Sequence, residues 1–307
     1  MWNVVVFEHD KPSAEISNFF GKVWDGQLTT ARACHFPKTL SCREDIIKET
    51  RGISAVGTEI DKILTLYGYG GAHHYTYGLC NHVPLPRVGE YLYIHIDHHS
   101  DSSPGYFESK YDRKARKSVK TGRYILGCGS FVEDIKNIGA KERLYIGTGK
   151  PWGVKYSPNW IDETSLKDGR SRNSAIKKAL DATICNDAYI SMDLDVLGHK
   201  EIETGFSRGN LTLEDLLKIL DRIRQYKNII GADILGYREK GSHLDRSRKP
   251  EHRYSYAISY LTYAIIACFL LEKDYYEIEK LRKDLMKVSA ENKNGINFEE
   301  VTKTLKI

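Results

Sequence analysis

Two apolar segments of this 307-residue chain each end at a cluster of acidic side chains. Residues 91–96 are apolar at nearly every position and run directly into Asp97, and residues 188–192 lead in the same way into Asp193. Continuous apolar runs of this length are typical of strands that are covered on both faces of a sheet. The pattern therefore predicts two buried strands with charged residues at their carboxyl ends.

Predicted strands and helices alternate along the rest of the chain. The pattern predicts strands near residues 3–8 and at 229–234, and helices in parts of 12–20 and 43–66, at 171–181 and at 213–225. Residues 102–125, which are rich in Ser, Lys and Arg, are predicted to be irregular. Alternating strands and helices favour an α/β fold with a parallel, doubly wound sheet. We expect a single domain over residues 1–307, with a charged helical segment at about 272–307.

The acidic clusters contain side chains that face the same way. Asp97, His99 and Asp101 are two residues apart and share one face of an extended segment, and the same holds for the pair at 193 and 195. The carboxyl ends of parallel strands meet at one edge of a sheet, where α/β proteins bind ligands. A Gly-Gly-Ala-His segment at 70–73 adds a histidine. The predicted metal ligands are therefore His73, Asp97, His99, Asp101, Asp193 and Asp195.

This set of side chains favours metal chemistry. Four carboxylates in one place repel one another unless cations compensate their charge. A mixture of imidazole and carboxylate suits manganese, iron or zinc better than magnesium or calcium. Two such ions at about 3.5–4 Å can share bridging carboxylates and lower the pKa of a bound water to about 7. The ligand set thus predicts a two-metal hydrolytic centre.

The composition of the chain mainly argues against certain kinds of site and location. The six cysteines are scattered without a Cys-x-x-Cys pair, which argues against a structural zinc site or a disulfide framework. The first residues lack the pattern of a secretory signal, and the most apolar segment, at 263–271, is too short to span a bilayer. We expect a cytoplasmic protein that contacts no membrane and no nucleic acid; a homo-oligomer is left open.

The order of the motifs resembles the ureohydrolase superfamily of arginases and agmatinases. The resemblance rests on Gly-Gly-x-His, then Asp-x-His-x-Asp, then Ser-x-Asp-x-Asp, and it continues in a Thr-Gly-rich loop at 204–212 and a strand at 232–234. It implies a three-layer α/β/α fold, two Mn²⁺ ions per chain, and hydrolysis of a guanidinium group with release of urea. By position, His73 and Asp101 hold one ion, while His99 and Asp195 hold the other. Asp97 and Asp193 bridge the two.

The chain departs from the family pattern in the residues that contact substrate. Ala72 stands where the family usually has an aspartate before its first histidine. Gly236 stands where free-arginine enzymes have a glutamate that binds the guanidinium group. A carboxylate pairs bidentately with a guanidinium, so another acid is required, and Glu8 at the end of the first strand is the best candidate. The predicted substrate-binding residues are Glu8, Asp10 and Thr204.

The proton-transfer group is also not in its usual place. The arginase histidine that shuttles protons lies between the second and third motifs, and this chain has no histidine between His99 and His199. The candidate catalytic residues are Asp101, His74 and His9. His243 and metal-bound water are alternatives.

These departures resemble a divergent branch that includes the peptide arginases, which convert arginine side chains within a ribosomally made peptide to ornithine. The implied substrate is an arginine-containing peptide. The net charge of +5 allows an acidic leader on that peptide. Residues 110–123 are locally basic, which indicates a solvated face or, alternatively, a docking patch for an anionic peptide or nucleic acid. No nucleic-acid-binding motif accompanies this stretch.

Other functions stay open at this point. The substrate could be a small free guanidino compound. Asp97-His98-His99 is also the triplet of the DHH phosphoesterases, but their other motifs occur in the reverse order. A single-zinc deacetylase would use only Asp97, His99 and a later aspartate. A non-enzymatic binding module could retain the metal core. Two manganese ions per chain would favour the ureohydrolase or the phosphoesterase, one zinc ion the deacetylase and no metal the binding module, and urea release from an arginine-containing peptide would single out the ureohydrolase.

Overall fold

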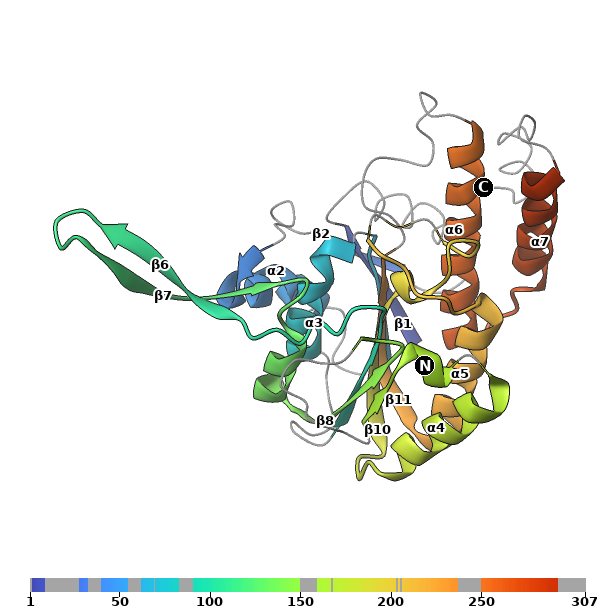
Figure 1. Cartoon of the computed structure of the whole chain (residues 1–307), viewed down its shortest axis with the longest axis horizontal. Coiled ribbons are helices and arrows are strands. Elements are labelled where there is room, and N and C mark those ends of the chain that lie inside the picture. The colour runs from blue at the N-terminus through green and yellow to red at the C-terminus, as the bar shows by residue number, and fades with distance from the viewer. Residues whose placement is uncertain are drawn as a thin grey trace.

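The computed structural model describes residues 2–8, 28–32, 40–54, 62–68, 70–82, 91–149, 159–166, 168–202, 204, 206–236 and 250–291. Within these ranges, an eight-stranded parallel sheet runs in the order β2-β1-β4-β11-β10-β5-β8-β9. Helices cover both of its faces (Figure 1). The predicted three-layer α/β/α fold with a doubly wound parallel sheet is confirmed.

The elements have the following bounds. The parallel sheet consists of β1 (Trp2–Glu8), β2 (Leu28–Arg32), β4 (Lys62–Leu66), β5 (Tyr91–Ile96), β8 (Ala140–Ile146), β9 (Trp160–Ile161), β10 (Asp187–Asp193) and β11 (Asn228–Leu235). A small antiparallel sheet consists of β3 (Leu40–Cys42), β7 (Lys117–Gly127) and β6 (Tyr106–Asp112). The helices are α2 (Arg43–Ser54), α3 (Thr76–His82), α4 (Gly169–Asp181), α5 (Leu213–Tyr226), α6 (Pro250–Leu270) and α7 (Tyr276–Glu291). Short 3-10 helices are η1 (Gly70–Tyr75), η2 (Val132–Ile138), η3 (Glu163–Leu166) and η4 (Leu194–Val196).

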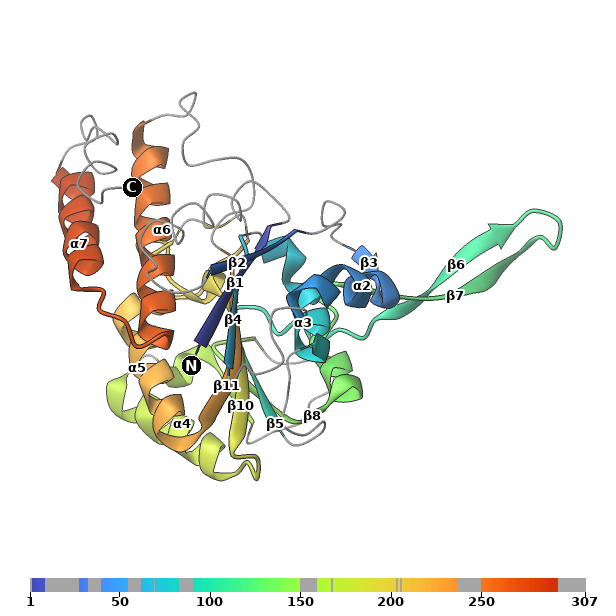
Figure 2. The same cartoon turned by 180° about the vertical axis from the view of Figure 1, so that it is seen from behind.

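The core has two halves, one on each face of the sheet. In β1, Val4 and Val6 join the cluster that includes α4, α5 and α6, while Val5 and Phe7 join the cluster that includes α2 and α3. All four side chains are fully buried. Figure 2 shows the same division from behind, with α2 and α3 on one side of the sheet and α4 to α7 on the other. Strands covered on both faces need apolar residues at every position, which explains the apolar runs in the sequence.

One central strand was missed by the sequence pattern. The segment 43–66 was predicted to be partly helical, and α2 occupies its start, but its end forms β4 between β1 and β11. Only three of the five residues of β4 are apolar, and so short a segment has no period that distinguishes a strand from a helix. The predicted helix near 12–20 lies outside the described residues.

The segment predicted to be irregular is a β-hairpin. Strands β6 and β7 pair antiparallel and project from the body of the molecule as an arm (Figures 1 and 2). Nearly all of their outer residues are exposed on both faces. Without a buried face the sequence lacks the apolar–polar alternation by which strands are recognised. We call residues 106–127 the β6–β7 arm.

The remaining predicted elements agree with the structure, apart from the end of the charged C-terminal segment at 292–307, which lies outside the described residues. Strands β1, β5, β10 and β11 and helices α4 and α5 occupy the predicted segments. Helix α7 packs on α6 through Leu281 and Leu285. No described helix has the length and apolar character that a membrane span requires.

Candidate metal centre

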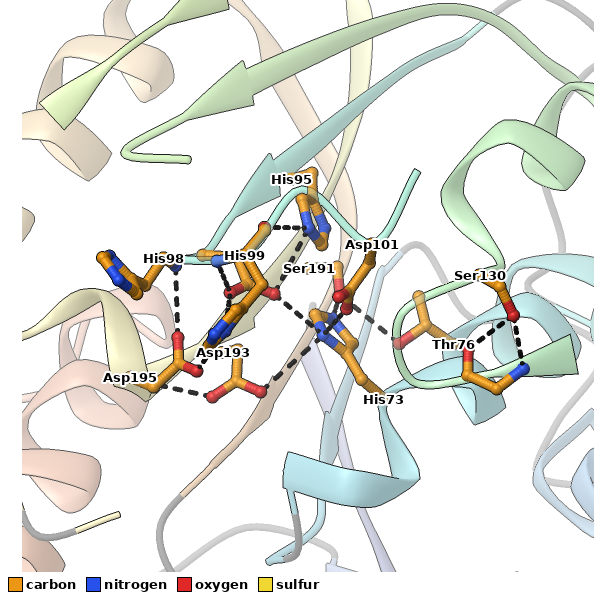
Figure 3. A network of polar contacts seen from close by, with 12 residues as sticks. His73, Thr76, His95, His98, His99, Asp101, Ser130, Ser191, Asp193 and Asp195 are labelled. Atoms are coloured by element: carbon orange, nitrogen blue, oxygen red, sulfur yellow. Dashed lines mark hydrogen bonds and ion pairs between the residues drawn. The ribbon is translucent and has the colours of Figure 1, made fainter. Parts of the chain in front are cut away.

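The predicted ligands follow strands that are neighbours in the sheet. His73 lies in η1, which comes after β4. Asp97 follows β5 directly, and Asp193 ends β10. Because β4, β11, β10 and β5 are consecutive and parallel, their carboxyl ends meet at one edge. Figure 3 shows the imidazoles of His73 and His99 pointing into one acidic cluster at this edge.

His73 lies at the centre of the first group of ligands. Its Nδ1 is 3.0 Å from Oδ2 of Asp101 and 3.1 Å from Oδ2 of Asp97. Oδ2 of Asp193 is 3.7 Å from the same nitrogen. The His73 side chain is fully buried, and its Nδ1 has no hydrogen-bond partner of good geometry among the described residues. A buried ring nitrogen that faces three carboxylates is suited to a cation shared with them.

His99 forms a second group with Asp195. Its Nδ1 is 2.8 Å from Oδ2 of Asp195 and 3.7 Å from Oδ1 of Asp97. Asp97 therefore offers one carboxylate oxygen to His73 and the other to His99. Two sets of ligand atoms, each with all its members within 4.8 Å of one another, could each hold a metal ion: His73, His95, Asp97 and Asp101, and Asp97, His99 and Asp195.

Each of the two histidines has a serine on its other ring nitrogen. Oγ of Ser191 lies 2.9 Å from Nε2 of His73, and Oγ of Ser207 lies 2.8 Å from Nε2 of His99. An imidazole that donates from Nε2 keeps the lone pair of Nδ1 free for a metal. The same arrangement at both histidines therefore orients Nδ1 toward the carboxylates.

Ser191 connects His73 to a buried aspartate in the next strand. Its hydroxyl donates to Oδ1 of Asp233 at 2.8 Å. Thr76 donates to the same oxygen at 3.1 Å, and the Tyr189 hydroxyl donates to Oδ2 at 2.8 Å. Since Ser191 uses its proton on Asp233, its oxygen is left to accept from His73. The network thus selects one tautomer of His73.

The titration of these groups reflects their crowding. Burial lowers the pKa of His73, but the carboxylates of Asp101 and Asp97 outweigh burial and raise it well above its usual value. Hydrogen bonds with Asp195 and Asp97 raise the pKa of His99 to about 11. Burial, followed by the charge of Asp97, raises the pKa of Asp193 to about 7. Protons are thus retained where negative charge is crowded, and divalent cations would compensate the same charge. The donor set fits a metal cluster.

His95 belongs to this cluster although it was not predicted as a site residue. Its Nε2 is 3.3 Å from Oδ2 of Asp97 and 3.1 Å from the carbonyl oxygen of His99. Its ring stacks on that of His73 at a centroid distance of 5.1 Å. The signal was present in the sequence, because His95 shares parity with Asp97 in an otherwise apolar strand.

Asp101 has a backbone conformation that is unusual outside glycine. Its φ of 45° lies in the left-handed region, which Asp and Asn adopt more readily than most residues. Its carbonyl oxygen accepts hydrogen bonds from the amides of Phe131 and Val132, both at 3.1 Å. The turn therefore directs the carbonyl toward η2 and the carboxylate toward His73.

This chain is related to known proteins through its central region. A family model described as the Arginase family matches residues 26–239. The chain belongs to the arginase family. Membership agrees with the predicted superfamily and makes the protein an arginase-family hydrolase. No curated protein sequence matches the chain closely enough to count as a relative.

Solved structures of the family share the fold at low sequence identity. Arginase from Bacillus subtilis is 17% identical with a TM-score of 0.57, covering 89% of this chain and 99% of its own. A hypothetical agmatinase from Burkholderia thailandensis is 20% identical with a TM-score of 0.55, covering 88% and 84%. An agmatine ureohydrolase from Thermoplasma volcanium is 14% identical with a TM-score of 0.56, covering 91% and 90%. These similarities show the arginase-family fold.

Gly236, where free-arginine enzymes have a glutamate, has no room for a side chain. It follows β11 with a φ of +81°, which favours glycine. A Cβ built on it would lie 1.9 Å from Oδ1 of Asp193 and 2.8 Å from the backbone nitrogen of Leu194. The space that a side chain at 236 would need is thus filled by a predicted metal ligand.

The other predicted site residues lie in different environments. His74 is fully buried, and its Nε2 lies 3.2 Å from Oγ of Ser41 in β3, which directs the ring toward β3. Thr204 accepts from the amide of Phe206 at 3.3 Å, and the Phe206 ring contacts that of His99 edge-on. Glu8 ends β1, at the same edge of the sheet as the metal ligands. His9, Asp10 and His243 lie outside the described residues.

Proposed function

We propose that this chain is a dimanganese hydrolase that converts arginine side chains within a peptide to ornithine and releases urea. The proposal is supported by membership of the arginase family and by the two groups of ligands that share Asp97. His73 and Asp101 would hold one ion, His99 and Asp195 would hold the other, and Asp97 and Asp193 would contribute to both. Such ions would supply a hydroxide nucleophile at neutral pH, because divalent ions of this kind lower the pKa of water to about 7.

The chain's own residues position the substrate and move its protons. The carboxylate of Glu8 receives the guanidinium group, because a bidentate carboxylate matches its planar donors. The water oxygen bonds to Cζ of the arginine side chain, and the bond from Cζ to Nε breaks. Both water protons end on Nε, and Asp101 carries them there. The products are urea and the side-chain ammonium of ornithine.

The access to the centre supports a substrate that is part of a longer chain. The His99 side chain is 40% exposed, while that of His73 is 1% exposed. The cluster is therefore reached from the side of His99. Gly236 supplies no carboxylate, and the guanidinium must be bound differently than in free-arginine enzymes. An approach from solvent suits an arginine side chain that extends from a peptide backbone.

A product assay tests this function directly. The purified protein is loaded with Mn²⁺ and incubated in parallel with an arginine-containing peptide, free arginine and agmatine. Urea is quantified, and the peptide is sequenced by mass spectrometry for ornithine. We expect ornithine in the peptide and little urea from the two small substrates. Rapid turnover of free arginine, or of agmatine, would overturn the peptide assignment, and one bound zinc ion per chain would overturn the reaction.

A further inference from the structure

The β6–β7 arm carries the positive charge of this protein. Residues 106–127 contain seven Lys and Arg side chains and two acidic ones, a net charge of +5 that equals the net charge of the whole chain. Arg123 is paired with Asp45. For the five cations nearest the tip, no ion pair exists within the described part of the chain. They are Lys110, Arg113, Lys114, Arg116 and Lys117.

The arm also exposes aromatic side chains. Seven large apolar or aromatic side chains are exposed among the described residues, and four of them lie on this arm: Tyr106, Phe107, Tyr111 and Val119. The ammonium group of Lys120 lies 5.3 Å from the Phe107 ring, and Tyr124 packs edge-on against the same ring. Because exposed apolar side chains that gather on one surface mark interaction sites, this concentration points to a partner for the arm.

Among the described elements, the β6 edge of the arm is open along its whole length, whereas β7 is paired on its other side by β3 at residues 125–127. In the small sheet β6 is the outer strand, and it pairs only with β7 among the described elements. An extended peptide can add to such an edge through main-chain hydrogen bonds. The seven residues of β6 span roughly 23 Å at 3.3 Å per residue. This edge distinguishes a peptide ligand from a nucleic acid, which has no backbone that could extend a sheet.

The base of the arm is joined to the metal centre. β6 begins five residues after Asp101, and the two legs of the arm are linked by a hydrogen bond from the amide of Ser103 to the carbonyl of Gly129. The carbonyl oxygen of Asp101 accepts hydrogen bonds from the amides of Phe131 and Val132, which follow β7 in the chain. A peptide that paired with β6 would therefore have one end next to Tyr106, five residues along the chain from a predicted metal ligand.

We propose that the β6–β7 arm is a docking site for an acidic, extended segment of the peptide substrate. The segment pairs with the open edge of β6, and its carboxylates meet the cations near the tip. This inference rests on the proposed function for the identity of the partner, since the same peptide presents its arginine to the metal centre.

A binding measurement without turnover tests the arm. The probe is a fluorescent peptide of about seven residues, the length of β6, made of Glu, Asp and small residues and lacking arginine. Its anisotropy is measured with the full chain and with the variant K110E/K114E/R116E/K117E. The control K136E/K141E/K200E/K280E changes the net charge by the same amount, at exposed lysines outside the arm. We expect the arm variant to bind the probe about tenfold or more weakly than the wild type. The control should bind it with an affinity within about twofold of the wild type.

Two further probes test the mode of binding. An acidic peptide with alternate N-methyl amides keeps its charge but cannot pair along a strand edge, and it should bind about tenfold more weakly. A single-stranded RNA oligonucleotide of equal charge is the comparison for nucleic acid. Equal binding by the arm variant and the control, unchanged binding after N-methylation, or tighter binding of the RNA would each overturn the proposal. Circular dichroism and thermal unfolding check that the variants are folded.

The two proposals fail in different assays. An arginine peptide without acidic residues reports the reaction alone. When an acidic segment is attached to it, we expect KM to fall about tenfold in the wild type and not in the arm variant, with kcat unchanged. If the reaction is absent but the probe still binds, only the proposed function is contradicted. If KM does not change when the acidic segment is attached, the proposed role of the arm is contradicted.

Discussion

Oγ of Ser191 lies 2.9 Å from Nε2 of His73, so that a residue of β10 orients a histidine that follows β4. Ser191→Ala removes this acceptor and leaves the His73 tautomer unselected. Because partners that orient metal-ligating histidines affect metal affinity by 10–100-fold, we expect a loss of about this size in calorimetric titration with Mn²⁺. Tyr189→Phe is the matched control, since it removes a different hydrogen bond to Asp233. If both variants bind Mn²⁺ equally well, Ser191 does not position His73.

Asp97 faces both histidine groups, and its loss should differ from the loss of a residue that faces only one. Asp97→Ala and Asp193→Ala should lose both ions and all measurable activity, because each would bridge the two. Asp195→Ala should retain one ion, since Asp195 lies in one group only. Metal content by mass spectrometry and urea release measure the two effects. An Asp97→Ala protein with normal metal content and rate contradicts the bridging role.

Gly236 should tolerate no side chain. Gly236→Ala places a Cβ 1.9 Å from Oδ1 of Asp193, so we expect Mn²⁺ affinity to fall by at least tenfold and the protein to lose about 1–3 kcal/mol of stability. Gly122 has the same φ of +81° with no atom near its Cβ position. Gly122→Ala therefore reports the backbone cost alone. If the two substitutions have equal effects in metal titration and in thermal unfolding, the contact with Asp193 is not the cause of the loss.

Glu8 is predicted to contact the substrate rather than the metals. Glu8→Gln keeps the size of the side chain and removes the charge that pairs with a guanidinium. We expect normal metal content and a KM for the arginine peptide that is raised at least tenfold, since a charged partner of a bidentate pair is lost. Unchanged KM and kcat would exclude Glu8 from the site.

Metal binding should strengthen as pH rises. The pKa of His99 is raised to about 11 by Asp195 and Asp97, so at neutral pH its proton must leave before Nδ1 binds a cation. That proton stabilises the metal-free fold fully below pH 6.5, and the contribution is lost as pH rises through 11. Affinity should rise roughly tenfold per pH unit for each displaced proton. Calorimetry in two buffers of different ionisation enthalpy counts the protons, and binding without proton release would contradict this.

The sequence carried the local part of the site better than its long-range part. The Asp-x-His-x-Asp segment holds three of the predicted ligands within five residues, although they converge through a bend after β5 and the left-handed conformation of Asp101 rather than through strand parity. The neighbours of the two histidines come from elsewhere: Ser207 lies 108 positions from His99, and Ser191 lies 118 positions from His73. No local pattern encodes such contacts, since they depend on how the strands are ordered in the sheet.

The fold shows the same limit. Strands β5 and β10 were predicted because each is a mainly apolar run that ends at an acidic residue. β4 is equally buried, but its five residues gave no period that could be told from helix. The strands of the β6–β7 arm were not predicted for the opposite reason, because neither face of the arm is buried. The pattern of apolar residues in the sequence therefore identifies buried strands, but it misses strands that are short or exposed to solvent.

The conformation of Gly236 has an evolutionary consequence. A codon change to glutamate at this position would place a side chain against Asp193 before its own carboxylate could reach a ligand. The backbone after β11 and the aspartate would have to move first, and each intermediate would have a damaged metal centre. Steric hindrance thus disfavours a glutamate at this position, and a carboxylate for a guanidinium group would have to come from elsewhere in the chain.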